Sequence, residues 1–250
     1  MTLIGDAHTR VEPIKGRRVL ITGGTTGIGR AIAVLLASEG AKVFVCGREK
    51  DDLAEALADI RKVGEGDGVA LDLGEEKGPG RFFDAGVKAL GGIDVAVVNA
   101  AIAAGGLTEE SEADLRYAIA VDFTGYLVSA QLAAKALNGA GDIVLIGSMS
   151  TYALGPSSTV YAGIKYGIQG FAVALRRELG PKGIRVSLIE PSLTQSDMPD
   201  IPAKEQTQRI AAEEMLRAED IAVGVHYVLS QPRRTVIQRL DITPRAMVEE

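Results

Sequence analysis

Short apolar runs alternate with amphipathic stretches along the chain, from about residue 17 to residue 243. The apolar runs are almost unbroken and rich in Val and Ile, which is typical of strands in a parallel sheet covered on both faces. The stretches between them carry apolar residues at helical spacing, and the first ends at Gly40. The pattern predicts strands at about 17–22, 41–47, 68–73, 93–99, 141–147, 184–190 and 236–242.

Helical patterns occupy the segments between these strands, the longest at 111–137. Strands and helices that alternate without a linker predict the α/β class, with a doubly wound, Rossmann-like parallel sheet in a single domain. Residues 1–16 are predicted to be an N-terminal extension, and residues 17–250 one dinucleotide-binding catalytic domain. The polar segment 192–217 contains two prolines and is predicted to form a mobile substrate flap.

The bulk composition excludes several classes of function. A chain of 250 residues with 46% apolar content can bury one large core. Its net charge of −6 argues against nucleic acid or an anionic membrane as the main partner. Cys46 is the single cysteine, so no internal disulfide is possible, and His8 and His226 are too far apart in sequence to suggest a metal site. Because the sequence has neither a signal-peptide pattern nor a long apolar span, we expect a cytoplasmic protein.

A glycine-rich stretch, TGGTTGIG, joins the first predicted strand to the first helix. Backbone amides at the N-terminus of such a helix can receive a phosphate, so the stretch predicts a dinucleotide site. Its glycines Gly23, Gly27 and Gly29 are not spaced as in the Gly-x-Gly-x-x-Gly of longer dehydrogenases, and the lysine of a triphosphatase loop is missing. The alternative is a tight turn without a ligand.

The end of the second strand indicates which dinucleotide is bound. A site that prefers NAD usually has Asp or Glu there, binding the ribose 2′-hydroxyl. This chain has Gly47 followed by Arg48, and a guanidinium suits a 2′-phosphate, so NADP is expected in preference to NAD. The alternative is an exposed arginine that pairs with Glu49 or Asp52.

Three residues downstream suggest acid–base chemistry. Ser148 follows the fifth strand, and Tyr161 and Lys165 lie four residues apart on one face of a helix. An ammonium near a phenol favours the phenolate, which makes Tyr161 a candidate general acid/base and Ser148 a candidate donor to the same substrate oxygen. The alternative is a packed tyrosine with a solvated lysine one turn later.

All these features fall at one edge of the predicted sheet, above the carboxyl ends of the strands, where such folds bind ligands. From about Arg17 to Thr243 the chain resembles the short-chain dehydrogenase/reductase family. The resemblance rests on TGGTTGIG, Asp72, Asn99-Ala100, Ser148, Tyr161-x-x-x-Lys165 and the GIRV segment before Pro191. It implies a nicotinamide cofactor and reversible hydride transfer between that cofactor and a carbonyl or alcohol carbon.

The resemblance also implies roles for individual residues. Tyr161 would exchange the proton, Ser148 would steady the substrate oxygen, and Lys165 would hold the nicotinamide ribose. Asp72 would meet the adenine edge, and Asn99 would lie beside the cofactor. The cofactor-binding set on this basis is Gly23, Thr25, Thr26, Gly27, Ile28, Gly29, Arg48, Asp72, Leu73, Asn99, Ala100, Tyr161, Lys165, Pro191, Ser192 and Ser196. Candidate substrate-wall residues are Ile102, Ser150, Tyr152, Leu154, Leu193 and Met198.

Three positions depart from the pattern of that family. Asp122 stands where the family commonly has an asparagine holding a water that leads to the lysine. It is included among the catalytic candidates, because its charge can pair with Lys165 and change the proton relay. Ala101 and Ser192 stand where glycines are usual, and Ser192 stiffens a turn beside the substrate.

The sequence therefore predicts an NADP-dependent oxidoreductase for a small-molecule ketone, aldehyde or alcohol, and by resemblance a homodimer or homotetramer. One alternative is an acyl-carrier ketone reductase, which would need a basic docking patch beside the flap. That segment offers only Lys204, Arg209 and Arg217 against several acids. The other alternative is a catalytically silent cofactor-sensing protein on the same fold, which only Asp122 favours.

Overall fold

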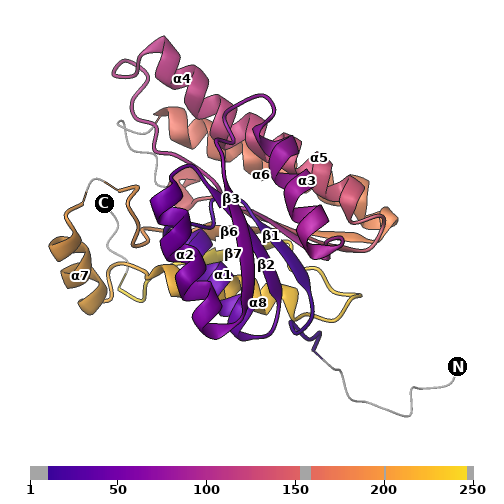
Figure 1. Cartoon of the computed structure of the whole chain (residues 1–250). Coiled ribbons are helices and arrows are strands. Elements are labelled where there is room, and N and C mark those ends of the chain that lie inside the picture. Colours follow the sequence, from indigo (N-terminus) through magenta and orange to yellow (C-terminus); the bar gives the residue numbers. More distant parts are fainter. Residues whose placement is uncertain (1–10, 153–158, 200, 247–250) are drawn as a thin grey trace, which may run out of the picture.

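A parallel sheet lies between two layers of helices in the computed structural model, which describes residues 11–152, 159–199 and 201–246 (Figure 1). Its strands are β1 (Arg18–Ile21), β2 (Lys42–Gly47), β3 (Glu65–Ala70), β4 (Val95–Val98), β5 (Gly141–Ile146), β6 (Ile184–Pro191) and β7 (Arg239–Ile242). Their order is β3-β2-β1-β4-β5-β6-β7, and each neighbouring pair is parallel. The strand order reverses between β1 and β4, the place where folds of this kind bind ligands. The predicted fold class is confirmed.

The helices cover both faces of the sheet (Figure 1). They are α1 (Gly27–Ser38), α2 (Lys50–Val63), α3 (Gly78–Leu90), α4 (Glu112–Ile119), α5 (Gly125–Ala136), α6 (Thr159–Leu179), α7 (Ala203–Ala211) and α8 (Ala218–Leu229). The described residues also contain the π-helical η1 (Ala120–Thr124) and the 3₁₀ turns η2 (Met149–Thr151) and η4 (Gly180–Lys182). Helices α1, α2 and α8 pack on one face, and α3, α5 and α6 pack on the other.

Alternate side chains of each strand enter the two helical layers. In β1, Val19 and Ile21 pack with α1, α2 and α8, whereas Leu20 packs with α3 and α5. In β5, Val144 and Ile146 enter the first layer and Leu145 enters the second. Period-two alternation between two apolar layers explains why the strand sequences are almost unbroken runs of apolar residues.

Two of the predicted strands have the wrong bounds. The third strand, expected at 68–73, spans Glu65–Ala70, so Asp72 lies beyond its end. This strand is at the edge of the sheet and pairs only with β2, which allows polar residues such as Glu65 and Asp67 in it. The last strand, expected at 236–242, is limited to Arg239–Ile242. The long helix expected at 111–137 is interrupted by η1, which sets the position of Asp122.

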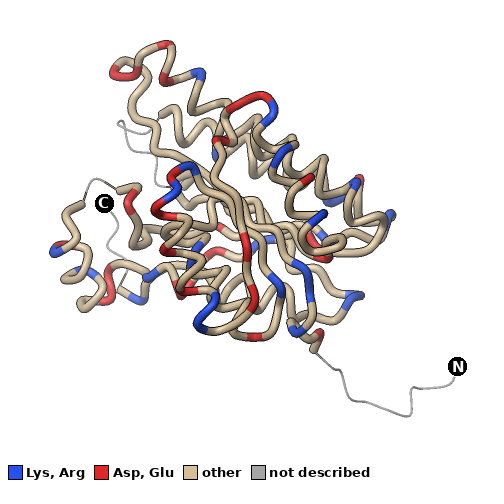
Figure 2. The backbone as a smooth tube through the Cα atoms, viewed as in Figure 1, with Lys and Arg blue, Asp and Glu red and all other residues tan. Residues whose placement is uncertain are grey.

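The segment expected to form a flap contains α7, which projects from the body of the molecule beside the sheet (Figure 1). The two ends of this segment are hydrogen-bonded to each other: the amide of Leu216 donates to the carbonyl of Leu193 at 3.0 Å. Among the described residues that precede β1, Ile14 is buried against the α1 and α8 layer. In Figure 2 basic and acidic residues are interspersed along the visible tube.

Candidate active site

The glycine-rich stretch forms a close turn between β1 and α1. A Cβ added at Gly29 would lie 2.0 Å from the carbonyl oxygen of Gly23, and one added at Gly23, where φ is +63°, would lie 2.7 Å from Ala100 Cα. Both positions therefore require glycine. The first turn of α1 is thus held against the ends of β1 and β4, with its N-terminal amides at the carboxyl edge of the sheet.

Asn99 and Thr22 hold this turn in place. The Asn99 side chain donates to the carbonyls of Thr22 and Gly23 at 3.1 and 3.0 Å. The Thr22 hydroxyl accepts the amides of Asn99 and Ala100 at 2.9 and 3.1 Å. Asn99, predicted to lie beside the cofactor, is therefore next to the glycine-rich turn and braces it.

A steric contact with Thr25 restricts which residue can occupy position 47, at the end of β2. A Cβ added at Gly47 would lie 2.0 Å from the hydroxyl oxygen of Thr25, which is buried in the glycine-rich turn. An aspartate or glutamate at position 47 cannot enter that space while Thr25 keeps its place. The absence of an acid at the end of this strand is therefore enforced by packing within the turn itself.

Arg48 and Asp72 lie on either side of Tyr117, a residue of α4. The Arg48 guanidinium donates to Glu49 at 2.9 Å through Nε and to the Tyr117 hydroxyl at 3.3 Å through Nη1. The Tyr117 hydroxyl donates to Asp72 at 2.8 Å. The pairing with Glu49 that was the alternative interpretation of Arg48 is thus present, and a second contact links the same guanidinium to Asp72 through the Tyr117 hydroxyl. Leu73, the next residue along, packs against the core on the α3 side.

Lys165 is a buried cation between two tyrosine rings. Its side chain is on α6 and the residue is only 2% exposed. Its Nζ lies 5.2 Å from the ring centroid of Tyr161 and 5.1 Å from that of Tyr126. Burial by itself would lower the pKa of Lys165. The phenols of Tyr126 and Tyr161 and the carboxyl of Asp122 outweigh burial and raise that pKa, so the ammonium stays charged.

The end of β5, which leads to Ser148, contacts this group through a backbone carbonyl. The Lys165 Nζ is 3.5 Å from the carbonyl oxygen of Ile146, two residues before Ser148. The Tyr126 hydroxyl donates to the same carbonyl at 2.8 Å, and burial raises the pKa of Tyr126 to about 12. The Ser148 Oγ accepts the amide of Ser150 at 3.1 Å, so the hydroxyl retains its proton for another acceptor.

Asp122 is fully buried in the π-helical turn between α4 and α5. Its Oδ1 accepts the amide of Ile102 at 2.8 Å, and its Oδ2 has no hydrogen-bond partner among the described residues. Burial raises the pKa of Asp122 to about 6, although the Lys165 charge opposes this shift. The structure therefore brings together Asp122 and Lys165, the pair that the sequence suggested.

Buried polar side-chain atoms without a partner in the described ranges occur at three residues only: Asp122 Oδ2, Ser150 Oγ and Ser192 Oγ. Each had been chosen from the sequence as a site residue. Buried polar groups are almost always hydrogen-bonded, and each unpaired one needs an explanation such as a ligand or a water. Their concentration at the predicted site is what a site built to receive polar ligand groups would have.

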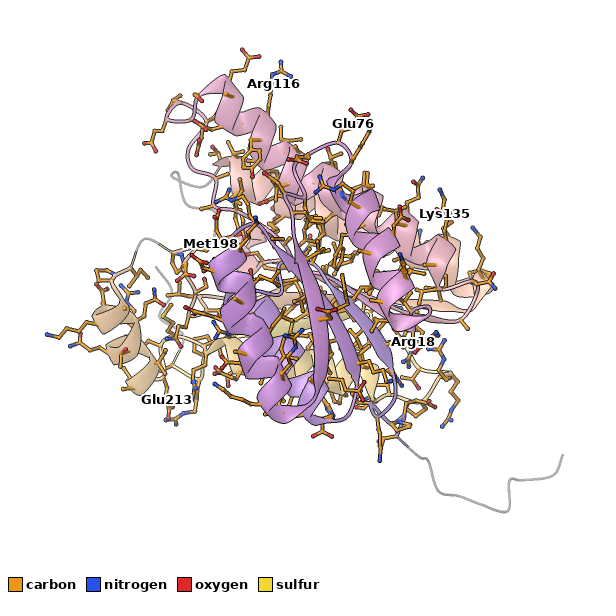
Figure 3. The ribbon with its side chains drawn as sticks, in the orientation of Figure 1. Arg18, Glu76, Arg116, Lys135, Met198 and Glu213 are labelled. Atoms are coloured by element: carbon orange, nitrogen blue, oxygen red, sulfur yellow. The ribbon has the colours of Figure 1, made fainter. Side chains whose placement is uncertain are left out.

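The segment after β6 also reaches the glycine-rich turn. A Cβ added at Gly27 would lie 3.3 Å from the Cβ of Ser196, so this serine lies at the start of α1. Gly27 and Ser196 line one end of a groove of about 800 Å³ that continues between α1 and α8. Figure 3 shows Met198 on the sheet side of α7, with Glu213 past the far end of that helix.

The hydroxyl of Tyr152, a residue predicted for the substrate wall, is hydrogen-bonded to side chains of α6 and β7. Tyr152 is half-exposed, and its hydroxyl accepts hydrogen bonds from Gln169 at 2.9 Å and Arg239 at 2.5 Å. Gln169 also donates to Glu190, whose carboxylate is fully buried. The Tyr152 hydroxyl is thus committed to a polar cluster beside β7. Leu154, another residue predicted for the wall, lies outside the described residues.

Comparison with known proteins identifies the family. Residues 17–206 match the family described as short chain dehydrogenase. The chain belongs to the short-chain dehydrogenase family. As the resemblance implied, it is thus a member of an oxidoreductase family that acts on alcohol and carbonyl groups.

Relatives and solved structures of this family cover most of the chain. Elsinochrome reductase 1 of Elsinoe fawcettii is 34% identical over 196 residues, 77% of this chain and 73% of that relative. A short chain dehydrogenase from Burkholderia cenocepacia in complex with NADP superposes with a TM-score of 0.83 at 29% identity, covering 93% of this chain and 98% of that one. An actinorhodin polyketide ketoreductase with NADPH superposes with a TM-score of 0.81 at 28% identity, covering 92% and 96%.

Sequence reasoning missed three residues that shape this short-chain dehydrogenase site: Thr22, Tyr117 and Tyr126. Tyr126 lies four residues after Asp122, and helical spacing places the two on one face. Thr22 directly precedes Gly23, so its place in the glycine-rich stretch could have indicated a role in the site. Tyr117 carries no such signal, because its partners lie in two other segments of the chain.

The described part of the chain holds no cluster of His, Cys, Asp and Glu that could bind a metal ion. None of the helices in those ranges has the length and apolar character of a membrane span.

Proposed function

We propose that this protein is an NADP(H)-dependent oxidoreductase that interconverts a ketone or aldehyde and the corresponding alcohol, with Tyr161 as general acid/base. The observation that carries the proposal is the buried Lys165 ammonium, 5.2 Å from the Tyr161 ring and 3.5 Å from the Ile146 carbonyl that leads to Ser148. A lysine kept charged in an apolar interior needs a reason beyond stability, and stabilising a phenolate is such a reason.

The residues of the carboxyl edge fit a dinucleotide. The amides at the start of α1 suit its pyrophosphate, and the unpaired hydroxyl of Ser192 suits a polar group of its nicotinamide end. Arg48 suits a 2′-phosphate, whereas an acid that would favour NAD is excluded from position 47 by Thr25. Further support comes from two structurally similar proteins, which hold NADP and NADPH.

In this proposal the bound nicotinamide supplies or accepts the hydride. Tyr161 gives its proton to the substrate oxygen in the reducing direction and removes it in the oxidising direction. The Ser148 hydroxyl donates to the same oxygen as negative charge develops there. Lys165 stabilises the phenolate left on Tyr161, and the free Oδ2 of Asp122 can accept a hydrogen bond from a water that returns the proton.

The structure gives little support to a docking site for an acyl carrier protein. Arg209 and Arg217, two of the three basic residues in the flap, are paired with Glu205 and Glu219. A cofactor-sensing protein without turnover would not need the buried lysine beside Tyr161. A homodimer or homotetramer and a cytoplasmic location remain predictions from the sequence.

The test is to follow the consumption of NADPH and NADH with a panel of ketones, aldehydes and β-keto esters, for the parent protein and Tyr161→Phe. We expect consumption with NADPH that falls at least about 100-fold in the variant, since a proton donor contributes that much or more. Tyr227→Phe, at an exposed tyrosine on α8, should match the parent. Binding of both cofactors without any turnover would instead favour the sensor.

A further inference from the structure

Tyr117 joins Arg48, which the proposed function assigns to the 2′-phosphate, to Asp72, which the resemblance places at the adenine edge. Its hydroxyl oxygen is 3.3 Å from Nη1 of Arg48 and 2.8 Å from Oδ2 of Asp72. Arg48 follows β2, Asp72 follows β3 and Tyr117 belongs to α4, so three separate segments meet at one hydroxyl. Figure 1 shows α4 at the same end of the sheet as the loop after β3.

The loop after β3 is shaped to receive the Tyr117 ring. A Cβ added at Gly74 would lie 2.7 Å from Cε2 of Tyr117, so the ring occupies the space that a side chain there would need. The amide of Gly74 donates to the other oxygen of Asp72 at 2.7 Å. Ring, glycine and carboxylate are therefore fitted to one another, which distinguishes this contact from a chance meeting of surface side chains.

The direction of each hydrogen bond is fixed by chemistry. A guanidinium can only donate, so the Tyr117 oxygen accepts from Arg48, and its single proton goes to Asp72. Burial raises the pKa of Tyr117, and the bond to Asp72 raises it further, so the proton stays in place at neutral pH. The neutral phenol thus links the Arg48 cation to the Asp72 anion through two hydrogen bonds.

We propose that Tyr117 is a positioning residue for the 2′-phosphate of the cofactor, acting through Arg48. This inference rests on the proposed function. The Arg48 side chain is 59% exposed and its Nε is held by Glu49, so its outer nitrogens depend on Tyr117 for direction. Tyr117 therefore favours nucleotides that carry a 2′-phosphate over those that lack it.

The experiment measures the binding of two nucleotide fragments by calorimetry, adenosine 2′,5′-bisphosphate and adenosine 5′-monophosphate. Neither fragment contains nicotinamide, so the measurement is independent of turnover. Tyr117→Phe removes one hydroxyl, and Tyr227→Phe is the matched control at an exposed tyrosine. We expect Tyr117→Phe to weaken the bisphosphate about fivefold, the worth of one hydrogen bond to a positioned group, and to leave the monophosphate within about twofold.

A double variant makes the result decisive. In an Arg48→Ala background, Tyr117→Phe should have no further effect on the bisphosphate, because the phenol acts through the guanidinium. Equal weakening of both fragments, unchanged bisphosphate binding, or tighter bisphosphate binding in Tyr117→Phe would each overturn the inference.

The two proposals fail in different ways. If Arg48→Ala itself leaves the bisphosphate unaffected, the assignment of NADP is wrong and the inference falls with it. If Arg48→Ala weakens the bisphosphate while Tyr117→Phe does not, the assignment stands and only the role of Tyr117 is rejected.

Discussion

The two ends of the candidate site use charge in opposite ways. At the end formed by β5, α5 and α6, Lys165 and Asp122 are buried at 2% and 0% exposure. At the end formed by β2, β3 and α4, the Arg48 side chain is 59% exposed and its partner Glu49 is 62% exposed. Buried charges interact strongly because water does not screen them, whereas an exposed pair contributes about 1 kcal/mol or less.

This difference separates two tasks that a dehydrogenase must perform. Proton transfer needs a group whose charge state is fixed by its surroundings, and in the proposed mechanism Lys165 is that group at the buried end. Choosing between two cofactors that differ by one phosphate needs only a modest difference in binding free energy, which an exposed guanidinium can supply. Substitutions at the buried end should therefore change turnover, and substitutions at the exposed end should change selectivity.

The largest effect is expected for Lys165→Met. Removing the ammonium leaves Tyr161 without the cation that stabilises its phenolate, so kcat/KM with NADPH should fall at least about 100-fold. Removing Lys165 alone leaves the buried Asp122 carboxyl without its cation, and removing one partner of a buried charged pair is destabilising. The melting temperature should therefore fall, which circular dichroism can check, and activity is compared at temperatures where both proteins are folded. Lys182→Met, at an exposed lysine paired with Glu178, is the control and should retain full activity.

Gly47→Ala tests whether packing against Thr25 excludes a side chain at the end of β2. The new Cβ would lie 2.0 Å from the Thr25 hydroxyl oxygen, so unfolding free energy should fall by about 2 kcal/mol, as for an overpacked site. At Gly170, on α6, an added Cβ has no heavy atom within 4 Å, and Gly170→Ala should be neutral or stabilising. Urea denaturation measures both. Equal effects of the two substitutions would remove the steric reason for the missing acid.

Asp122→Asn tests the buried end through the pH dependence of the unfolding free energy. The raised pKa of Asp122, about 6, means that the folded state binds the proton more tightly than the unfolded chain does. The stability that this proton provides is complete below the unfolded pKa and is lost as the pH rises through about 6. Relative to Asp122→Asn, the parent should lose about 1 kcal/mol of unfolding free energy between about pH 5 and pH 7.5. Parallel pH profiles of the two proteins in urea denaturation would contradict this.

The sequence was sufficient for the parts of the fold and site that depend on local pattern. Periodicity and glycine placement predicted seven strands in a doubly wound sheet, and the spacing of Tyr161 and Lys165 predicted a shared helix face. The start of β3 was misplaced because Glu65 and Asp67 look like loop residues, although an edge strand accepts them. Local pattern does not report which neighbours a strand will have.

The remaining site contacts depend on tertiary packing and have no local signature. The meeting of Tyr117 with Arg48 and Asp72 joins positions separated by 69 and 45 residues. The cluster that holds the Tyr152 hydroxyl is built from α6, β6 and β7 in the same way. The need for glycine at position 47 is also non-local, because the side chain that would clash there is Thr25, outside the strand.

The most direct test of the separation between the two ends is the steady-state kinetics of Arg48→Ala with NADPH and with NADH. A residue that binds ground state and transition state alike changes KM and leaves kcat unchanged. The account predicts that KM for NADPH rises about tenfold, that kcat at saturating NADPH stays within about twofold, and that the constants for NADH hardly change. A fall in kcat with both cofactors, or an unchanged KM for NADPH, would contradict it.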